Sequence, residues 1–262
     1  MHQSEREHLI LGLLANSSLV TFQQLSNVLD ASAATIRRDL KRLEARGLVV
    51  RLHGGIKRAH QTPAEGSPAE LQESLIANRP QKVLIGARAA ELVKDGSSII
   101  LNGGTTTYAM AMALVHHKVQ VLTNSNTIAR FLLSQSNNRV FVPGGEIFRE
   151  QNLILSPFDN DVIRNFHGGT MFLGAYGVGS MGVMENDHLL VQAEHKLMQR
   201  AERLILLVES EKFARRASLV LCDLSRLDTV VTDDGLSKAD EAMLERAGVR
   251  VLKVRRASKA KS

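Results

Sequence analysis

From residue 81 onward, short apolar segments alternate with segments of helical periodicity, and this alternation limits the fold more than any other feature of the sequence. The apolar segments lie at 98–101, 119–122, 140–142, 171–173 and 204–208. Strands that are joined through helices pair in parallel, because each helix returns the chain to the same end of the sheet. We therefore expect an α/β domain over residues 81–254, with a mostly parallel sheet and helices on both faces.

Each expected strand is followed by a loop rich in glycine, serine, threonine or asparagine. The loop at 102–107 lies between a strand and a helix, so backbone N–H groups, hydroxyls and a helix N-terminus are available to bind a phosphate. Ligands of open α/β sheets bind at the carboxyl ends of the strands. One such loop can also be explained as a tight turn, and this one lacks the spacing of a Walker A or dinucleotide-binding motif. Four such loops at successive strand ends favour a binding site.

Charge is distributed unevenly along the chain. Residues 1–60 carry nine Lys or Arg and five Asp or Glu, residues 61–249 carry 18 and 22, and residues 250–262 carry six basic residues and no acidic one. A basic N-terminal region followed by an acidic body indicates two modules, the first a candidate for binding nucleic-acid phosphates. We expect the basic end, 255–262, to be a frayed terminus, and the segment 59–80 to be a linker.

Residues 1–58 predict a winged helix-turn-helix domain. Helical periodicity predicts helices over 4–15, 21–28 and 33–46, and the β-prone segment 48–58 contains the glycine turn of a wing. The residues expected to face the core after the first helix are Leu25, Val28, Leu29, Ile36, Leu40 and Leu43. The basic residues of the third helix lie away from that face, where a recognition helix contacts DNA. A purely structural three-helix subdomain would leave this basic face unexplained.

The N-terminal module resembles the DeoR family of bacterial repressors of sugar metabolism. The residues that carry the resemblance are Arg6, the sequence TIRRDL at 35–40, Leu43, Glu44, Gly47 and the sequence HGG at 53–55. The resemblance implies that the third helix reads operator DNA, where arginine can form two hydrogen bonds with guanine. The residues expected to contact DNA are Ser32, Thr35, Arg37, Arg38, Lys41, Arg42, Arg51 and His53. Asp39 is unusual beside a polyanion, and we expect it to be an internal partner that orients Arg38 or caps local structure.

The second module resembles the DeoR sensor domain, through the motifs at 102–106, 123–125, 144–145, 172–174 and 212–213. That domain shares its fold with ribose-5-phosphate isomerase, glucosamine-6-phosphate deaminase and CoA transferases. The resemblance therefore implies a phosphorylated sugar or sugar acid as effector. The expected effector-binding residues are Asn102, Gly103, Gly104, Thr105, Thr106, Thr107, Asn124, Ser125, Gly144, Gly145, Gly174, Tyr176, Lys196 and Lys212.

Three departures from the family pattern remove acidic groups. Asn102 stands where the family usually has aspartate, the pair at 168–169 is Gly-Gly where the family has Ala-Asp, and Gln192 replaces a glutamate. Fewer acids would suit a more anionic or differently hydroxylated ligand. The segments 155–157 and 193–196 are similar to the branch of ascorbate-utilisation repressors, so a sugar-acid phosphate is a further expectation.

Two other functional classes are compared with a regulator. A sugar-phosphate isomerase or deaminase carrying a DNA-binding domain needs a carboxylate base; Glu185, Asp187 and Glu194 are possible bases, while Gly169 stands where such an enzyme would carry an acid. A scaffold protein would show no salt-dependent DNA binding. The single Cys222 and the spacing of the histidines indicate no metal site. We expect a cytoplasmic regulator without a cofactor and without enzymatic activity, which assembles as a dimer or tetramer on operator DNA.

Overall fold

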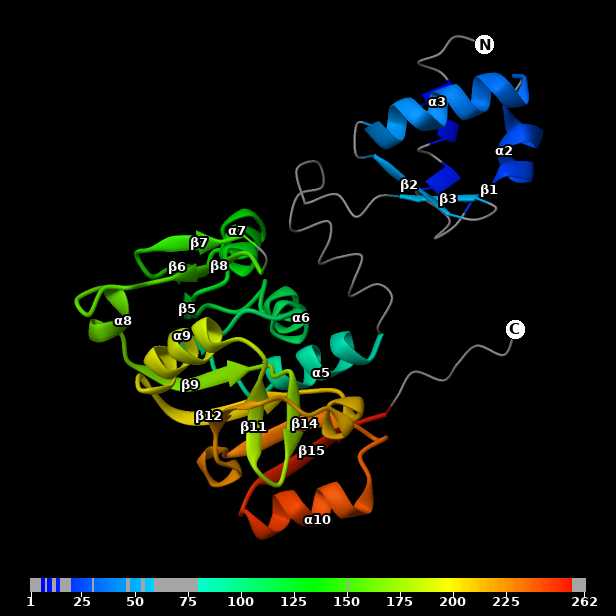
Figure 1. Ribbon diagram of the computed structural model, residues 1–262. Helices are drawn as coiled ribbons and strands as arrows, with labels where there is room; N and C mark the ends of the chain where they lie inside the picture. The colour runs from blue at the N-terminus through cyan, green and yellow to red at the C-terminus, as the bar shows by residue number, and fades with distance from the viewer. Residues whose placement is uncertain are drawn as a thin grey trace. The chain divides into compact units, whose positions relative to one another are not determined.

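The computed structural model describes residues 6–7, 9–10, 13–14, 20–29, 31–45, 48–52, 55–58, 80–149 and 151–255. The chain divides into two compact units, Met1–Ser67 and Pro68–Ser262 (Figure 1). The predicted linker, 59–80, lies outside the described residues except for Pro80, which begins a helix. Of the predicted basic end, 255–262, only Arg255 is described.

The first unit is a winged helix-turn-helix, as predicted. Helix α2 (Phe22–Val28) begins after Thr21, whose hydroxyl accepts a hydrogen bond from Gln24 N while the Gln24 side chain accepts one from Thr21 N. Helix α3 (Ala33–Ala45) begins after Ser32, whose Oγ accepts a hydrogen bond from Thr35 N. Strands β2 (Val49–Leu52) and β3 (Gly55–Arg58) form the predicted hairpin. Strand β1 (Val20–Thr21), which was not predicted, pairs with β3.

The core of the first unit is formed by apolar side chains at helical spacing. Described residues of the predicted first helix are helical, and Ile10 and Leu14 are buried. The buried residues of α2 and α3 include Leu25, Leu29, Ile36, Leu40 and Leu43. The expectation for Val28 was wrong, because its side chain is 46% exposed. The helix ends at Val28, and the extended backbone of Leu29 directs that side chain into the core instead.

The second unit is built on one seven-stranded sheet in which every pair of neighbouring strands is parallel. The strand order is β15-β14-β12-β9-β4-β5-β6. The strands are β4 (Ser98–Leu101), β5 (Gln120–Thr123), β6 (Arg139–Phe141), β9 (Gly168–Leu173), β12 (Ala201–Leu207), β14 (Thr229–Asp233) and β15 (Arg250–Val254). The parallel sheet confirms the predicted α/β class, and β14 and β15 extend it beyond the segments that were predicted as strands.

The remaining elements surround this sheet. The helices are α5 (Pro80–Ala90), α6 (Thr105–Ala113), α7 (Asn126–Gln135), α8 (Val162–Asn165), α9 (His188–Met198), α10 (Lys238–Arg246) and the 3-10 turns η1 (Ser210–Ala214) and η2 (Leu224–Arg226). The smaller sheets are the hairpin β7 (Glu146–Phe148) with β8 (Leu153–Leu155), and β10 (Gly177–Gly179), β11 (Gly182–Glu185) and β13 (Leu219–Cys222) in the order β10-β11-β13. Neither small sheet was predicted. Helix α6 begins four residues before the helix expected at 109–115, so Thr105 and Thr106 belong to its first turn.

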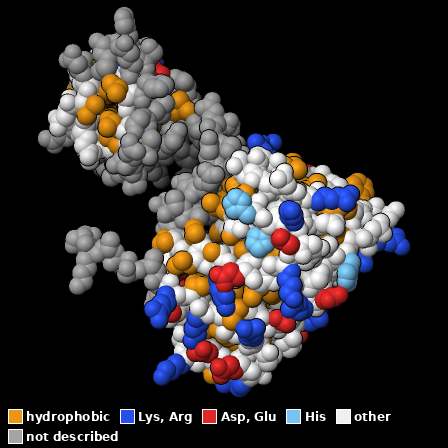
Figure 2. Space-filling model, turned by 180° about the vertical axis from the view of Figure 1, so that it is seen from behind, with side chains coloured by type: hydrophobic (Ala, Val, Ile, Leu, Met, Phe, Trp, Pro, Cys, Tyr) orange, Lys and Arg blue, Asp and Glu red, His pale blue; other side chains and the backbone are white. Residues whose placement is uncertain are grey.

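The surface of the second unit carries charges of both signs. On the face drawn in Figure 2, Lys and Arg side chains are interspersed with Asp and Glu. A few charged residues of this unit are instead buried, namely Lys82, Glu185, Glu194, Glu209 and Asp233. Because burying a charge requires a partner or a change of protonation state, these residues mark the part of the unit with unusual chemistry.

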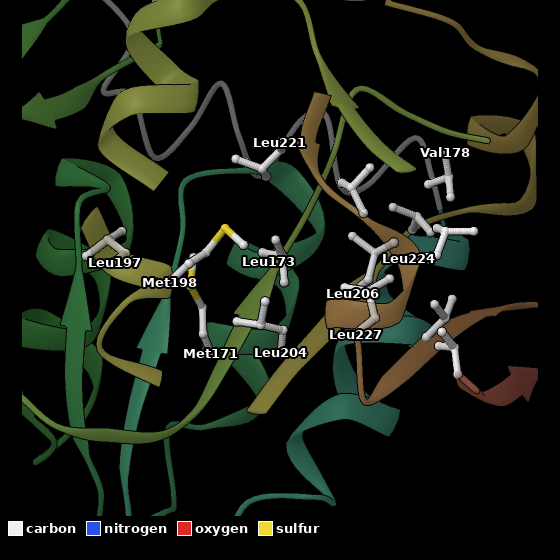
Figure 3. Packing of buried hydrophobic residues seen from close by; sticks show 14 of the residues in the cluster. Met171, Leu173, Val178, Leu197, Met198, Leu204, Leu206, Leu221, Leu224 and Leu227 are labelled. Carbon is white, nitrogen blue, oxygen red and sulfur yellow. The ribbon is translucent and has the colours of Figure 1, made fainter. Parts of the chain in front are cut away.

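Two hydrophobic cores cover the two faces of the large sheet. Successive side chains of β4 point to opposite faces of the sheet. Ile99 and Leu101 belong to the core beneath α5, α6 and α7, whereas Ile100 belongs to the other core. This second core contains Met171 and Leu173 of β9 together with residues of β12 and α9 (Figure 3). The alternation confirms that a sheet buried on both sides produces continuous apolar runs in the sequence.

Helices α5 and α6 touch through their backbones at Gly86. A Cβ atom on Gly86 would lie 2.5 Å from Met110 N and 2.6 Å from Ala109 C. A distance this short excludes any side chain without displacement of a helix. The contact therefore fixes α5, which carries Lys82 one turn earlier, against α6.

Candidate functional site

The direction of strand addition reverses between β4 and β9. From β4 the chain continues outward through β5 and β6, and it then returns to the other side of β4 as β9. The loops that follow β4 and β9 consequently diverge and leave a crevice, the usual position of a ligand in open α/β sheets. Asn102 joins the two strand ends, because its Oδ1 accepts a hydrogen bond from Gly174 N at 3.0 Å.

A cavity of about 270 Å³ lies at this reversal. Its lining residues come from the loops after β4 and β9 and from several elements distant in the sequence. They are Lys82, Gly103, Gly104, Thr105, Thr106, Gln151, Gly174, Ala175, Tyr176, Glu185, Asn186, Leu190, Glu194, Leu207 and Lys212. Such a volume and lining suit a small polar metabolite.

One wall of the cavity is the N-terminus of α6. The residue that precedes the helix, Gly104, has no side chain that could cap it, and Thr105 and Thr106 of the first turn also line the cavity. Unsatisfied N–H groups at a helix N-terminus attract anions. Gly103 packs closely against Leu153, because a Cβ there would lie 2.0 Å from Leu153 Cδ2 and would displace that side chain. This wall can cradle a phosphate.

Two lysines bring positive charge to the same cavity. Lys82, on α5, is 7% exposed and forms a buried ion pair with Glu209. Lys212, on η1, lies 5.8 Å from the centre of the Tyr176 ring. Burial lowers the pKa of Lys212, and the neighbouring charges of Arg215 and Lys82 lower it further. An anionic ligand would relieve this concentration of positive charge.

Two buried carboxyl groups face the cavity from the other side. Glu194, on α9, is 1% exposed, and its Oε1 accepts a hydrogen bond from Asn102 Nδ2 at 2.6 Å. Burial raises the pKa of Glu194 to about 8, and the nearby Glu185 adds to this effect. Glu185 accepts a hydrogen bond from Tyr176 N at 2.9 Å, and burial raises its pKa as well. The cavity therefore holds a carboxyl group that is mostly neutral near pH 7.

The structure gathers about half of the predicted effector-binding residues at the cavity. Those that line it are Gly103, Gly104, Thr105, Thr106, Gly174, Tyr176 and Lys212. Asn102, Thr107, Asn124 and Ser125 are buried and support these loops. Asn124 Oδ1 accepts a hydrogen bond from Gly103 N, Thr107 Oγ1 donates one to Gly104 O, and Ser125 caps α7.

Three of the predicted effector-binding residues lie elsewhere. Gly144 and Gly145 precede β7, where a Cβ on Gly145 would lie 2.0 Å from Leu155 O, so this glycine serves backbone packing. Lys196 Nζ donates a hydrogen bond to Ser156 O at 2.9 Å and lines a separate cavity of about 260 Å³. Their role in effector binding stays a prediction.

Several lining residues were not predicted to bind the effector. They are Lys82, Gln151, Ala175, Glu185, Asn186, Leu190, Glu194 and Leu207. Glu185 and Glu194 were considered only as bases of the alternative enzyme. Lys82 has the sequence context of an ordinary surface lysine on an amphipathic helix, and nothing in the sequence signals that it is buried.

In the first unit, α3 presents a basic surface. Its exposed basic residues are Arg37, Arg38, Lys41 and Arg42. Four cations on one short helix suit a phosphate backbone and guanine edges. Of the other predicted DNA contacts, Ser32 is hydrogen bonded to Thr35 Oγ1 at 2.9 Å, the side chain of Arg51 lies outside the described residues, and so does the whole of His53.

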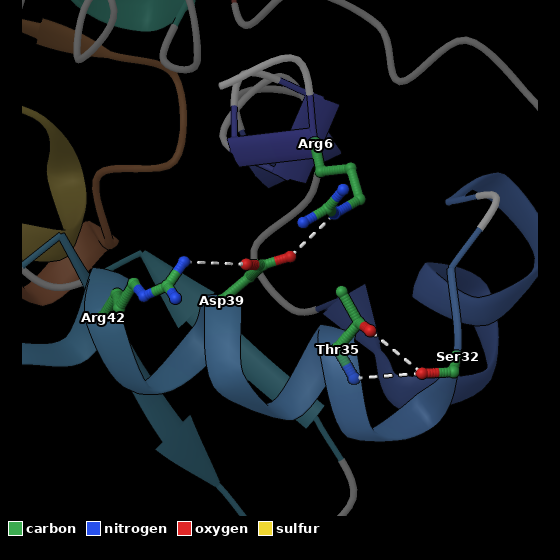
Figure 4. Close-up of polar contacts among 5 residues, drawn as sticks. All are labelled: Arg6, Ser32, Thr35, Asp39 and Arg42. Carbon is green, nitrogen blue, oxygen red and sulfur yellow. Dashed lines mark hydrogen bonds and ion pairs between the residues drawn. The ribbon is translucent and has the colours of Figure 1, made fainter. Parts of the chain in front are cut away.

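Asp39 is buried beneath this basic surface. It is 1% exposed, and its carboxylate pairs with Arg6 Nε at 2.8 Å and with Arg42 at 3.5 Å (Figure 4). Asp39 is thus an internal partner, as expected, but the expectation that it orients Arg38 was wrong. Its carboxylate is buried, where Arg6 from the N-terminal segment reaches it, and the α3 arginine that it pairs with is Arg42.

The described residues give no indication of a metal centre or of a membrane span. Within them, no three His, Cys, Asp or Glu side chains are grouped so that they could hold a metal ion. None of the helices in these parts of the chain is long and apolar enough to cross a bilayer.

Both units match known protein families. Residues 6–62 match the DeoR-like helix-turn-helix domain, and residues 77–234 match the DeoR C terminal sensor domain. Relatives named HTH-type transcriptional regulator UlaR, from Shigella sonnei and Escherichia coli, are each 28% identical to this chain over 254 residues, which cover 97% of it and 100% of the relative.

Among solved structures, ribose 5-phosphate isomerase A from Methanocaldococcus jannaschii matches with a TM-score of 0.38 and 18% identity, over 50% of this chain and 53% of the isomerase. The delta subunit of eIF2B from Chaetomium thermophilum matches with a TM-score of 0.40 and 16% identity, over 55% of this chain and 53% of the subunit.

Proposed function

The chain belongs to the DeoR family of transcriptional regulators, and from this premise we propose that it represses a sugar or sugar-acid catabolic operon until a phosphorylated metabolite binds the second unit. The observation that carries the proposal is the cavity at the β4–β9 reversal, which combines the N-terminus of α6 with Lys82 and Lys212. An uncapped helix end and two cations in one small cavity select a ligand with a compact, doubly charged anion such as a phosphate monoester.

The first unit supplies the DNA contacts. Helix α3 enters the major groove, where Arg37, Arg38 and Lys41 meet base edges and phosphates. Arg42 pairs with Asp39 at 3.5 Å, which favours one position of its guanidinium before DNA arrives. A single small domain reads few base pairs, and symmetric operators are read by symmetric proteins. We therefore propose a homodimer or tetramer assembled through the second unit.

Induction follows from a difference in affinity. A metabolite can release the operator only if it binds one arrangement of the oligomer more tightly than the arrangement that binds DNA. Lys82 offers a route for this coupling, because it lies on the first turn of α5, the helix that begins at Pro80 where the segment from the DNA-binding unit ends. An anion that draws Lys82 from Glu209 would act directly on that helix.

A second candidate is a sugar-phosphate isomerase or deaminase, which the two buried carboxyls Glu185 and Glu194 favour. Matches to proteins named transcriptional regulators over nearly the whole chain support the first candidate instead. Turnover of a sugar phosphate by the purified protein would establish the second.

One set of measurements tests the proposal. The full chain is mixed with DNA from upstream of its own gene in gel-shift assays at several salt concentrations, while a panel of phosphorylated sugars and sugar acids is screened by thermal shift. We expect operator affinity to fall steeply with salt, since several phosphates are neutralised. At least one phosphorylated compound should raise the melting temperature and weaken the operator complex. Salt-independent DNA binding, or a panel with no effect on either reading, would contradict the proposal.

A further inference from the structure

The carboxyl group of Glu194 is held at one oxygen and unsatisfied at the other. Asn102 Nδ2 donates to Oε1 at 2.6 Å, while Oε2 has no hydrogen-bond partner among the described residues, although it is buried. The residue also lines the cavity. A buried polar atom without a partner is rare in a folded protein and calls for one.

The surroundings of Glu194 favour the neutral acid over the carboxylate. The residue is 1% exposed and, within the described parts of the chain, forms no ion pair. The titratable groups around it are Glu185 on β11, which would repel a carboxylate, and Cys222 on β13, whose thiol pKa burial raises to about 11. The cations Lys82 and Lys212 line the same cavity, but Lys82 is paired with Glu209. A neutral carboxyl has one proton to donate, and Asn102 already donates to Oε1, so that proton belongs on Oε2.

Resting on the function proposed above, we propose that Glu194 is a specificity-determining residue: its protonated carboxyl donates a hydrogen bond from Oε2 to an acceptor oxygen of the metabolite, a hydroxyl or a carboxylate oxygen beyond the phosphate. In this arrangement, the phosphate binds at the N-terminus of α6 and near the two lysines, and the protonated Glu194 recognises an oxygen on the remaining part of the metabolite. A ligand without an acceptor oxygen at that distance leaves the buried Oε2 unsatisfied and binds less tightly.

This role makes binding depend on pH. An ionised Glu194 has no proton to donate and repels a phosphorylated ligand, so affinity should fall once Glu194 ionises. Lys212 also loses its charge in alkaline solution, and its loss would weaken binding in the same direction. The two effects are separated by Glu194→Gln, since the amide has nearly the same shape and donates a hydrogen bond at every pH.

The test is isothermal titration of the full chain with three probes, 6-phosphogluconate, glucitol 6-phosphate and inorganic phosphate, at about pH 7.5 and about pH 9.5, where phosphate monoesters stay doubly charged. In the unmodified protein we expect affinity for at least one sugar probe to fall about tenfold or more over this range, since each pH unit above the pKa removes about nine-tenths of the protonated form. The Glu194→Gln protein should bind that probe with similar affinity at the lower pH, and its affinity should fall several-fold less between the two pH values than that of the unmodified protein. Inorganic phosphate, which does not reach Glu194, should show the same pH profile in both proteins.

Preference for 6-phosphogluconate identifies a carboxylate as the acceptor, and preference for glucitol 6-phosphate identifies a hydroxyl. The exposed Glu245→Gln serves as the matched control. An unchanged pH profile in Glu194→Gln would overturn the role of Glu194 and leave the proposed function standing. Binding of no probe by either protein would overturn the cavity as the effector site, and this inference with it.

A second measurement needs no variant. Infrared difference spectroscopy of the unmodified chain should show the band of a protonated carboxyl at about pH 7.5. In the complex with the probe, this band should persist to a higher pH than in the free protein, because a hydrogen bond donated by the carboxyl proton stabilises the protonated form. A band that disappears on binding would show that the ligand takes the ionised form, and would overturn the inference.

Discussion

Asn102 Nδ2 lies 2.6 Å from Glu194 Oε1 and so connects the end of β4 to helix α9. The same side chain accepts a hydrogen bond from Gly174 N through Oδ1. An aspartate at this position, which the family pattern leads one to expect, would have no N–H to donate to Glu194 and would bring a second carboxylate against a buried carboxyl group. The amide therefore explains this departure from the pattern: it positions Glu194 without adding charge to the site.

The raised pKa of Glu194 should appear as a pH dependence of stability. Between the ordinary pKa of 4.5 and the folded-state pKa of about 8, the folded protein holds a proton that the unfolded chain has released. The stability contributed by this proton is complete below about pH 4.5 and is lost as the pH rises towards 8, with a slope of at most about 1.4 kcal/mol per pH unit. Denaturant unfolding of the second unit at several pH values, compared with Glu194→Gln, should show a difference that grows over this window. Parallel curves for the two proteins would contradict a raised pKa.

Thr106→Asp should remove the response to the effector and leave DNA binding intact. The added carboxylate lies in the first turn of α6, where it suits the helix N-terminus but repels a phosphate. We expect ligand affinity to fall by about 30-fold or more, which corresponds to about 2 kcal/mol. Thermal shift with a stabilising sugar phosphate measures the loss, and Thr106→Asn is the uncharged control of the same shape. Normal induction in the Thr106→Asp protein would count against the cavity.

Asp39→Asn should destabilise the DNA-binding unit. The change neutralises a buried carboxylate that pairs with Arg6 Nε at 2.8 Å and with Arg42 at 3.5 Å. Removal of one partner from an ion pair on a buried carboxylate destabilises the fold. Hydrogen exchange of the α3 amides should become faster, while Glu44→Gln, on the exposed side of the same helix, should leave exchange unchanged. Equal protection in both variants would show that the buried pair contributes little.

Arg38→Ala should weaken operator binding without unfolding the protein. Arg38 is exposed on α3, so its removal creates no cavity, and an arginine that contacts bases contributes about 1–3 kcal/mol. Gel shifts at fixed salt should show a loss of about tenfold or more, with an unchanged melting temperature. Arg130→Ala, an exposed arginine on α7, should bind the operator as the unmodified protein does. A full-affinity Arg38→Ala protein would exclude this arginine from the interface.

Sequence patterns predicted the architecture because they report burial and capping. The apolar runs identified β4, β5, β6, β9 and β12. A strand that is buried on both faces of a sheet has apolar residues at successive positions, so it stands out in the sequence as a continuous apolar run. The small sheets and the last two strands were not predicted. Glycine-containing strands such as Gly177–Gly179 and Gly182–Glu185 have weak strand propensity, and they form through pairing with distant segments, β11 with β13 for example.

The site was predicted only where it is local in sequence. The Gly103–Thr106 loop carries its own signal, a glycine pair between a strand and a helix. Lys82 and Glu194 reach the same cavity from α5 and α9, and no spacing in the sequence brings them together. Burial of a lysine or glutamate depends on long-range packing, which a single sequence does not reveal. Asp39 shows the same limit, because its partner Arg6 lies 33 residues away.

The backbone contact at Gly86 makes this position sensitive to substitution. Any side chain there would press against Met110 N and Ala109 C and push apart the helix bearing Lys82 and helix α6, whose first turn lines the cavity. Under the function proposed above, variants that bind DNA but no longer respond to the metabolite should therefore include Gly86 substitutions, although this glycine is not among the residues lining the cavity. A survey limited to ligand-contacting residues would miss such variants, although a single nucleotide change is enough to produce them.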